Sequence, residues 1–109
     1  MSSLDDGKLA FDNGQYDIAL SELLPFAERG NAEAQCMVGN IYHLGLGIPS
    51  NLTEAVKWYA ASADRGYAVA SNNLATIFQT GGENFPVDAV ESQKWRNKSI
   101  EQGFIHSSL

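Results

Sequence analysis

The amino-acid sequence predicts an all-α protein, an α-α superhelix (solenoid) of three helix-turn-helix repeats. Two internal repeats support this prediction, and so does the lack of any strand-like pattern. Glycines recur at Gly30, Gly66 and Gly103, which are 36 and 37 residues apart. A second segment, residues 34–45, recurs as residues 70–81, again 36 residues apart. No stretch alternates apolar and polar residues with a period of two, so we expect no sheet.

The period of these repeats divides the chain into units. Trp58 and Trp95 each stand eight residues before a repeated glycine, and each follows a lysine. We expect a single domain, residues 1–109, with units at 3–30, 31–66 and 67–103 and a tail at 104–109. Each unit is expected to bury its apolar face on the next.

The first unit has a short connection between its two helices. Asn13 and Gly14 form a dipeptide that is typical of tight turns. The second helix is expected over residues 16–29 and contains Pro25. Proline removes one backbone hydrogen bond and bends a helix, so we expect a kink at this position.

The middle and last units carry capping residues where helices are expected to start. Asn31 directly precedes a helical pattern of apolar residues at positions 34, 38, 41 and 42. Asn51 stands three residues before Glu54, and Asp88 stands three before Glu91. This offset is that of a capping box. Each second helix is expected to end at a repeated glycine.

The middle unit resembles a Sel-one-like repeat, a relative of the tetratricopeptide repeat. The matching positions are Ala34, Val38, Gly39, Tyr42, Gly45, Gly47, Ile48, Ala55, Trp58, Ala63 and Gly66. Residues 67–103 match less closely, with Ala75 in place of Gly39 and Phe78 in place of Tyr42. Residues 3–30 are similar to the shortened leading unit of bacterial members. The resemblance implies a scaffold or adaptor role, not a chemistry.

The net charge of −6 argues against partners that require clustered basic residues. Nucleic acids and anionic membrane surfaces are such partners. Residues 1–54 hold eight acidic against two basic residues, whereas residues 55–109 hold five of each. This acidic half is expected either to attract a basic partner or to serve only as a soluble surface. No signal peptide or membrane-spanning run is evident, so we expect a cytoplasmic protein.

No catalytic, cofactor-binding or metal-binding residues are expected. His43 has no Cys, Asp or Glu four residues away that could share a metal ion, and the other histidine is His106. Cys36 is the single cysteine and lies two helical turns from His43, too far to be activated by it. The repeat positions of Trp58 and Trp95 favour core packing over ligand stacking. We therefore expect no enzyme.

The first helix of each pair is expected to line a concave groove that binds a partner. After core positions are removed, outward positions remain on each of these helices. In the leading unit they are Asp5, Asp6, Leu9 and Asp12. In the middle unit they are Cys36, Met37, Asn40, His43 and Leu44. In the last unit they are Asn72, Asn73, Thr76, Gln79 and Thr80. Amides and hydroxyls suit hydrogen bonding to a peptide backbone, and acids suit a basic anchor.

Two functions are compatible with this pattern. The first is a cytoplasmic adaptor that holds a peptide or helix of another protein in its groove. The second is a dedicated inhibitor or immunity-type protein that neutralises one basic toxin or enzyme. Residues Phe104, Ile105 and Leu109 of the tail are expected to fold back as a small apolar lid, or to form the contact of a homodimer at the C-terminal end.

Overall fold

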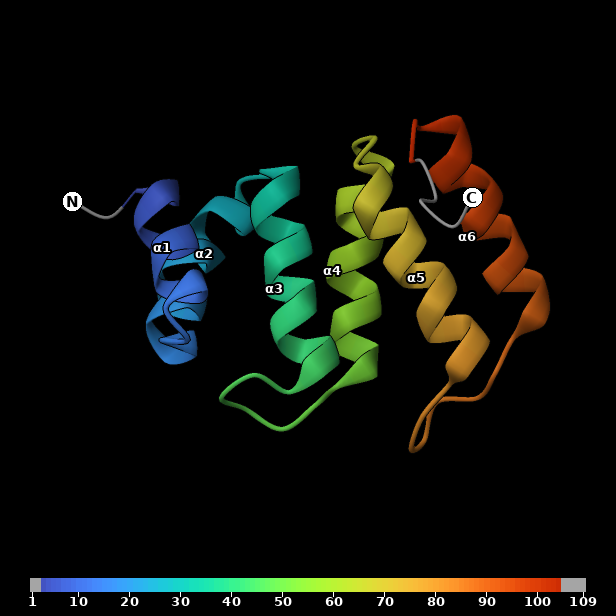
Figure 1. Ribbon diagram of the computed structural model, residues 1–109, viewed down its shortest axis with the longest axis horizontal. Helices are drawn as coiled ribbons and strands as arrows, with labels where there is room; N and C mark the ends of the chain where they lie inside the picture. Colours follow the sequence, from blue (N-terminus) through green and yellow to red (C-terminus); the bar gives the residue numbers. More distant parts are fainter. Residues whose placement is uncertain (1–2, 105–109) are drawn as a thin grey trace.

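A computed structural model describes residues 3–104, which form six helices stacked in chain order (Figure 1). The helices are α1 (Leu4–Asp12), α2 (Tyr16–Glu28), α3 (Ala32–Leu44), α4 (Leu52–Asp64), α5 (Ala68–Thr80) and α6 (Ala89–Glu101). Within residues 3–104 the extended structure is limited to one isolated bridge between Gly82 and Phe85. The prediction of an all-α repeat fold is confirmed.

Three of the six described helices, α3, α4 and α6, begin at the capping residues that the sequence indicates. The side chains of Asn31, Asn51 and Asp88 each accept a hydrogen bond from a backbone N–H in the first turn of the helix that follows. A full capping box lies elsewhere, at Ser3 and Asp6, where each side chain accepts from the other's backbone N–H. Asp6 therefore stabilises the start of α1.

The repeated glycines end the second helices, as predicted. Gly30, Gly66 and Gly103 have φ angles of 96°, 92° and 100°, which L side chains rarely adopt. Gly45 and Gly47 adopt the same left-handed region in the turn between α3 and α4. Pro25 lies inside α2, and the helix continues past it to Glu28.

Two clusters of small and aliphatic side chains form the core. The first joins α1, α2 and α3, and its buried members are Ala10, Ala19, Leu23, Ala27, Ala34, Val38 and Ile41. The second joins α3, α4 and α5, and its buried members are Cys36, Ala55, Tyr59, Ala63, Ala70, Leu74 and Ile77. Helix α3 contributes to both clusters and so couples the first half of the chain to the second.

The two tryptophans occupy the rim of the core. Trp58 packs against the first cluster and Trp95 against the second, but both rings are only partly buried. Lysine ammonium groups lie over them, with Lys57 Nζ 5.0 Å from the Trp58 ring centroid. The fully buried aromatic residue is Tyr59, which is 0% exposed. Packing of the tryptophans against the core is confirmed, although the largest fully buried ring is that of Tyr59, next to Trp58.

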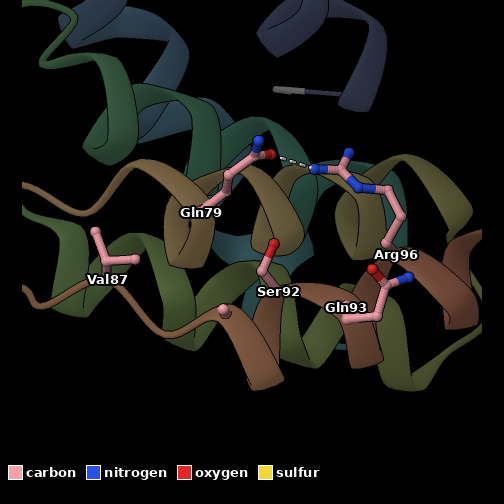
Figure 2. Close-up of a pocket in the computed structure, with 6 residues that line it drawn as sticks. Gln79, Val87, Ser92, Gln93 and Arg96 are labelled. Carbon is pink, nitrogen blue, oxygen red and sulfur yellow. Dashed lines mark hydrogen bonds between the residues drawn. The ribbon is translucent and has the colours of Figure 1, made fainter.

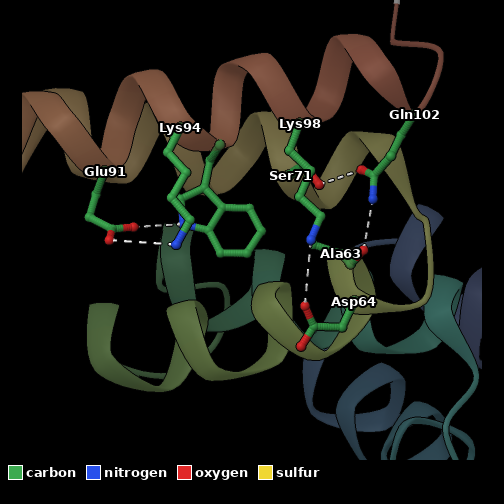
Figure 3. A network of polar contacts seen from close by, with 8 residues as sticks. Ala63, Asp64, Ser71, Glu91, Lys94, Lys98 and Gln102 are labelled. Carbon is green, nitrogen blue, oxygen red and sulfur yellow. Dashed lines mark hydrogen bonds and ion pairs between the residues drawn. The ribbon is translucent and has the colours of Figure 1, made fainter.

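Side-chain amides close the junctions between units. Gln35 Nε2 donates to the carbonyl of Ala27 near the end of α2. At the next junction the residue equivalent to Gln35 is Ser71, which is too short to do so. Gln102 donates to the carbonyl of Ala63 instead, and Ser71 Oγ donates to Gln102 Oε1 (Figure 3). Each amide adds a second donor to a carbonyl that already accepts from the backbone N–H of the glycine after the helix, Gly30 or Gly66.

Helix α6 differs from α4 on the face that turns away from the preceding helices. Val56 and Ala60 of α4 are partly buried against the second cluster, whereas the equivalent Gln93 and Asn97 are exposed and hydrogen-bonded to each other. Apolar exposure on α6 is confined to its ends, at Val90 and Ile100. Of the residues expected to form the apolar lid or homodimer contact, Phe104 is described and half-buried, whereas Ile105 and Leu109 lie outside the described residues, so this expectation stays a prediction.

Candidate protein-binding face

Helices α1, α3 and α5, the first helix of each pair, form one continuous face (Figure 1). We call it the first-helix face. Side-chain contacts link the three helices across it. Lys8 Nζ of α1 lies 3.3 Å from Glu33 Oε1 of α3. Asn73 Nδ2 of α5 donates to Asn40 Oδ1 of α3 at 3.3 Å. These two contacts connect α1 to α3 and α3 to α5 across the first-helix face.

The predicted groove residues differ widely in exposure. The exposed ones are Asp5, Asp6, Leu9, Asp12, Leu44, Gln79 and Thr80. The half-buried ones are Met37, Asn40, His43, Asn72, Asn73 and Thr76. Cys36 does not lie on the surface, because the side chains of α4 and α5 cover it and leave it 3% exposed. Its placement in the groove is therefore wrong.

Three predicted groove residues and the core residue Tyr59 form a hydrogen-bonded chain where α3, α4 and α5 meet. The Tyr59 hydroxyl donates to Asn40 Oδ1 at 2.5 Å, and Asn73 Nδ2 donates to the same oxygen. His43 Nδ1 lies 3.1 Å from the Tyr59 hydroxyl oxygen. Since the single hydroxyl proton is directed to Asn40, His43 Nδ1 must carry the proton of its contact. The other ring nitrogen, Nε2, is then an acceptor.

His43 borders a pocket of about 340 Å³ between the α3–α4 turn and the α5–α6 loop. The other lining residues are Ser50, Leu52, Gly81, Gly82 and Glu83. Burial lowers the pKa of His43 below its ordinary value of 6.5. The ring is therefore neutral at pH 7, as its role as donor to Tyr59 and acceptor toward the pocket requires.

The lowered pKa of His43 makes stability depend on pH. The unfolded chain binds a proton at His43 at a higher pH than the folded chain does. The contribution of neutral His43 to stability is therefore fully present above pH 6.5 and is lost as the pH falls below it. We expect the urea midpoint to fall more between pH 7.5 and 5.5 in the wild-type chain than in His43→Gln. Glutamine is the matched replacement because Gln79 holds the equivalent position 36 residues later. Equal pH dependence of the two chains would contradict this assignment.

Two predicted groove amides face α6. Arg96 Nη1 donates to Asn72 Oδ1 at 2.8 Å. Arg96 Nη2 donates to Gln79 Oε1 at 2.7 Å (Figure 2). Their oxygen atoms are therefore engaged by the helix that follows. Asn72 and Gln79 stand seven residues apart, which places them on one side of α5, but their spacing alone does not say which neighbour they meet.

Sequence reasoning missed two residues of the first-helix face. Glu33 lies four residues before Met37 and pairs with Lys8. Val69 lies four residues before Asn73 and is 43% exposed. Both extend a stripe at helical spacing, so the signal that could have found them is the extension of each predicted stripe by one turn toward the helix start.

Reactive chemistry is not evident in the described part of the chain. Residues 3–104 contain no group of three or more His, Cys, Asp or Glu side chains that could hold a metal ion. Burial, and then the negative charge of Glu33, raise the pKa of the Cys36 thiol to about 12. The thiol is thus protonated at neutral pH and is not a nucleophile. None of the described helices is long and apolar enough to cross a membrane.

Comparisons with solved structures agree with this architecture. A Sel1 repeat protein from Oxalobacter formigenes superposes with a TM-score of 0.85 and 29% identity, covering 94% of this chain and 42% of that one. A protective antigen of uropathogenic Escherichia coli strains that displays an SLR fold superposes with a TM-score of 0.75 and 30% identity, covering 79% of this chain and 18% of that one.

Similar proteins from eukaryotes are much longer than this chain. An F-box protein of Arabidopsis thaliana is 33% identical over 82 residues, which are 74% of this chain and 22% of that protein. Chitin synthase regulatory factor 3 of Schizosaccharomyces pombe is 32% identical over 76 residues, 68% of this chain and 8% of that protein. The chain thus spans less than a quarter of the length of these relatives.

The Sel1 repeat pattern itself matches residues 32–67 and 68–104, which contain α3 to α6. Helices α1 and α2 precede these two matches and form a further helix pair of the same kind. Sel1 repeat proteins bind other proteins and are typically interaction modules without enzymatic activity. The sequence repeats, the helix stack and the comparisons together show that this chain belongs to the Sel1 repeat family.

Proposed function

We propose that the chain is a cytoplasmic adaptor module that binds an extended segment of a partner protein along the first-helix face. The observation that supports this proposal best is the side-chain amide pair Asn40 and Asn73. Asn40 Oδ1 accepts two hydrogen bonds, from Tyr59 and from Asn73. This arrangement fixes the orientation of both amides before any partner arrives.

In the described part of the chain, these hydrogen bonds leave one donor and one acceptor of the amide pair unused. Within residues 3–104, Asn40 Nδ2 and Asn73 Oδ1 have no hydrogen-bond partner, although both residues are half-buried. A peptide group carries one C=O and one N–H. Its carbonyl would accept from Asn40 Nδ2 while its N–H donates to Asn73 Oδ1. Such a contact reads the backbone of a partner and not its side chains.

Exposed aliphatic side chains flank the amide pair on the same face. Leu9 of α1 is 60% exposed, Leu44 of α3 is 63% exposed, and Val69 of α5 completes the set. Their separation on three adjacent helices suits a segment that runs across the stack. Burying these side chains against a partner removes apolar surface from water, which is worth about 25 cal/mol per Å² buried, while the amides set the register.

The proposal is tested with the partner captured from the native host, by calorimetric titration against variants. Asn40→Asp keeps the oxygen that Tyr59 and Asn73 contact but removes the outward donor, and we expect it to weaken binding about tenfold or more. Asn97→Asp on α6 makes the same change outside the face and is the matched control. Leu44→Ser, on α3, has its matched control in Val90→Ser. Val90 is exposed like Leu44 but lies on α6, outside the face. Equal losses in a variant and its control would overturn the proposal.

A second candidate function, inhibition of one basic toxin or enzyme, is favoured by the charge of the first two helices. Asp5, Asp12 and Asp17 are exposed there. The same titration separates the two functions, because steering by exposed acids gives a steep dependence of the association rate on salt. Asp5→Asn with Asp12→Asn tests this steering, and Asp6 is left intact because it caps α1. A single basic partner with a salt slope that these changes flatten would favour the inhibitor.

A further inference from the structure

A second potential binding site lies at the other end of the stack, around Arg96 of α6 (Figure 2). Its guanidinium group is held by two neutral oxygens, Asn72 Oδ1 at 2.8 Å and Gln79 Oε1 at 2.7 Å. The hydrogen bonds fix the planar group against α5. They do not neutralise its charge, because both acceptors are amides.

Two acidic side chains that contact residues of α6 pair with other groups. Glu91 accepts from Trp95 Nε1 and lies 3.8 Å from Lys94 Nζ, while Asp64 pairs with Lys98 at 4.0 Å (Figure 3). Within residues 3–104, no carboxylate oxygen lies within 4.0 Å of the Arg96 guanidinium. Arg96 thus presents a positionally fixed positive charge that has no ion-pair partner in the described part of the chain.

The Arg96 side chain borders a pocket of about 290 Å³. The other lining residues are Gln79, Val87, Ala89, Ser92 and Gln93. Val87 and Ala89 provide apolar surface beside the charge, so that the methylene groups of an acidic side chain have a surface to cover. A guanidinium group has five N–H donors, and the two amide oxygens use two of them.

Comparison with the middle unit indicates that the surface beside Arg96 and Gln79 is one on which other side chains pack. Arg96 stands 37 residues after Tyr59, and Gln79 stands 36 after His43. The contact between Tyr59 and His43 in the middle unit corresponds to the contact between Arg96 and Gln79 in the last. In the middle unit Asn73 of α5 approaches this site and bonds to Asn40 beside Tyr59. In the last unit a pocket occupies the corresponding place.

We infer that this pocket binds the carboxylate of an acidic side chain on a partner protein, with Arg96 as the charged donor. Hydrogen bonds between a guanidinium and a carboxylate are short and about twice as strong as neutral ones. The apolar lining selects a side chain, with its methylene groups, over a bare anion. The site lies apart from Asn40 and Asn73, and it stands whether or not the first-helix face binds a peptide.

The test is a titration of the complete chain with small probe molecules. Binding is monitored by NMR, through the chemical shift of the Arg96 Nε–Hε signal. The probes are N-acetyl-glutamate N-methylamide and its neutral isostere N-acetyl-glutamine N-methylamide. We expect a saturable shift with the first probe and binding about tenfold or more weaker with the second. Equal binding of the two probes, or no saturable shift with either, would overturn the inference.

Variants and a third probe assign the charge and the source of the carboxylate. Arg96→Gln is expected to lose the saturable shift, monitored then at the backbone amides of α6. Lys94→Gln is the matched control and should keep it, because Lys94 pairs with Glu91 on the same helix. N-acetyl-glycine offers a terminal carboxylate without a side chain, and tighter binding of this probe would overturn the assignment to an acidic side chain. If Arg96→Gln does not fold, the comparison of the two first probes in the wild-type chain still decides.

Discussion

Replacing Tyr59 with alanine is expected to cost about 3–5 kcal/mol of the free energy of unfolding. The ring is fully buried at the centre of the cluster that joins α3, α4 and α5. Its removal leaves a cavity and also strips His43 Nδ1 and Asn40 Oδ1 of a hydrogen-bond partner. A loss of this size is a large fraction of the stability of a small domain, so we expect much of the chain to be unfolded at 37 °C.

Two comparison variants separate the contributions of the Tyr59 side chain. Tyr59→Phe keeps the ring and removes only the hydroxyl, and is expected to cost about 1–3 kcal/mol. Trp58→Ala truncates a larger ring that is only partly buried, and should cost less than Tyr59→Ala. Urea unfolding followed by circular dichroism measures all three. A greater loss for Trp58→Ala than for Tyr59→Ala would contradict the assignment of the central core residue.

The second large effect is expected at Gly39, where α3 approaches the Tyr59 ring. A Cβ atom at this position would lie 2.6 Å from Cδ1 and Cε1 of that ring, which is closer than carbon atoms pack. Gly39→Ala should therefore destabilise the chain by about 1–3 kcal/mol through overpacking. The higher helix propensity of alanine, worth up to about 1 kcal/mol, offsets part of this cost.

The overpacking explanation of Gly39→Ala has a direct check in a double-mutant cycle with Tyr59→Leu. Removal of the ring makes room for the new methyl group, so the alanine should cost less, or even stabilise, in the leucine background. The last unit provides a natural parallel, since Ala75 takes the place of Gly39 where Arg96 takes the place of Tyr59. Additive effects of the two substitutions, measured by urea unfolding, would show that the ring and the glycine are not coupled.

The helix boundaries could be predicted because local chemistry determines them. Asn31, Asn51 and Asp88 cap helices through contacts three residues away, and glycine ends helices because it alone adopts positive φ freely. The box at Ser3 and Asp6 follows the same pattern and was open to the same reasoning. The outward position of Asp6 on its helix predicts a groove residue, whereas its carboxylate accepts from the Ser3 backbone N–H.

The orientation of side chains between helices could not be predicted in the same way. Trp58 and Tyr59 are adjacent in sequence and point about 100° apart around α4, so periodicity alone does not tell which ring is central. Cys36 and Asn72 hold equivalent repeat positions, yet Cys36 is buried where α5 covers it and Asn72 is half-buried beside Arg96. Such differences depend on residues 24 to 37 positions away, which belong to another helix.

The measurement that tests the proposed binding face most directly is an NMR titration of the side-chain amide signals with the captured partner. Asn40 and Asn73 each carry a side-chain NH₂ group that can be followed, and Asn97 on α6 serves as an internal reference outside the face. We predict that the partner shifts the Asn40 and Asn73 signals, slows exchange of the Asn40 NH₂ protons with water, and leaves Asn97 unchanged. Shifts confined to α2, α4 and α6, with the Asn40 and Asn73 signals unmoved at saturation, would contradict the proposal that the first-helix face binds the partner.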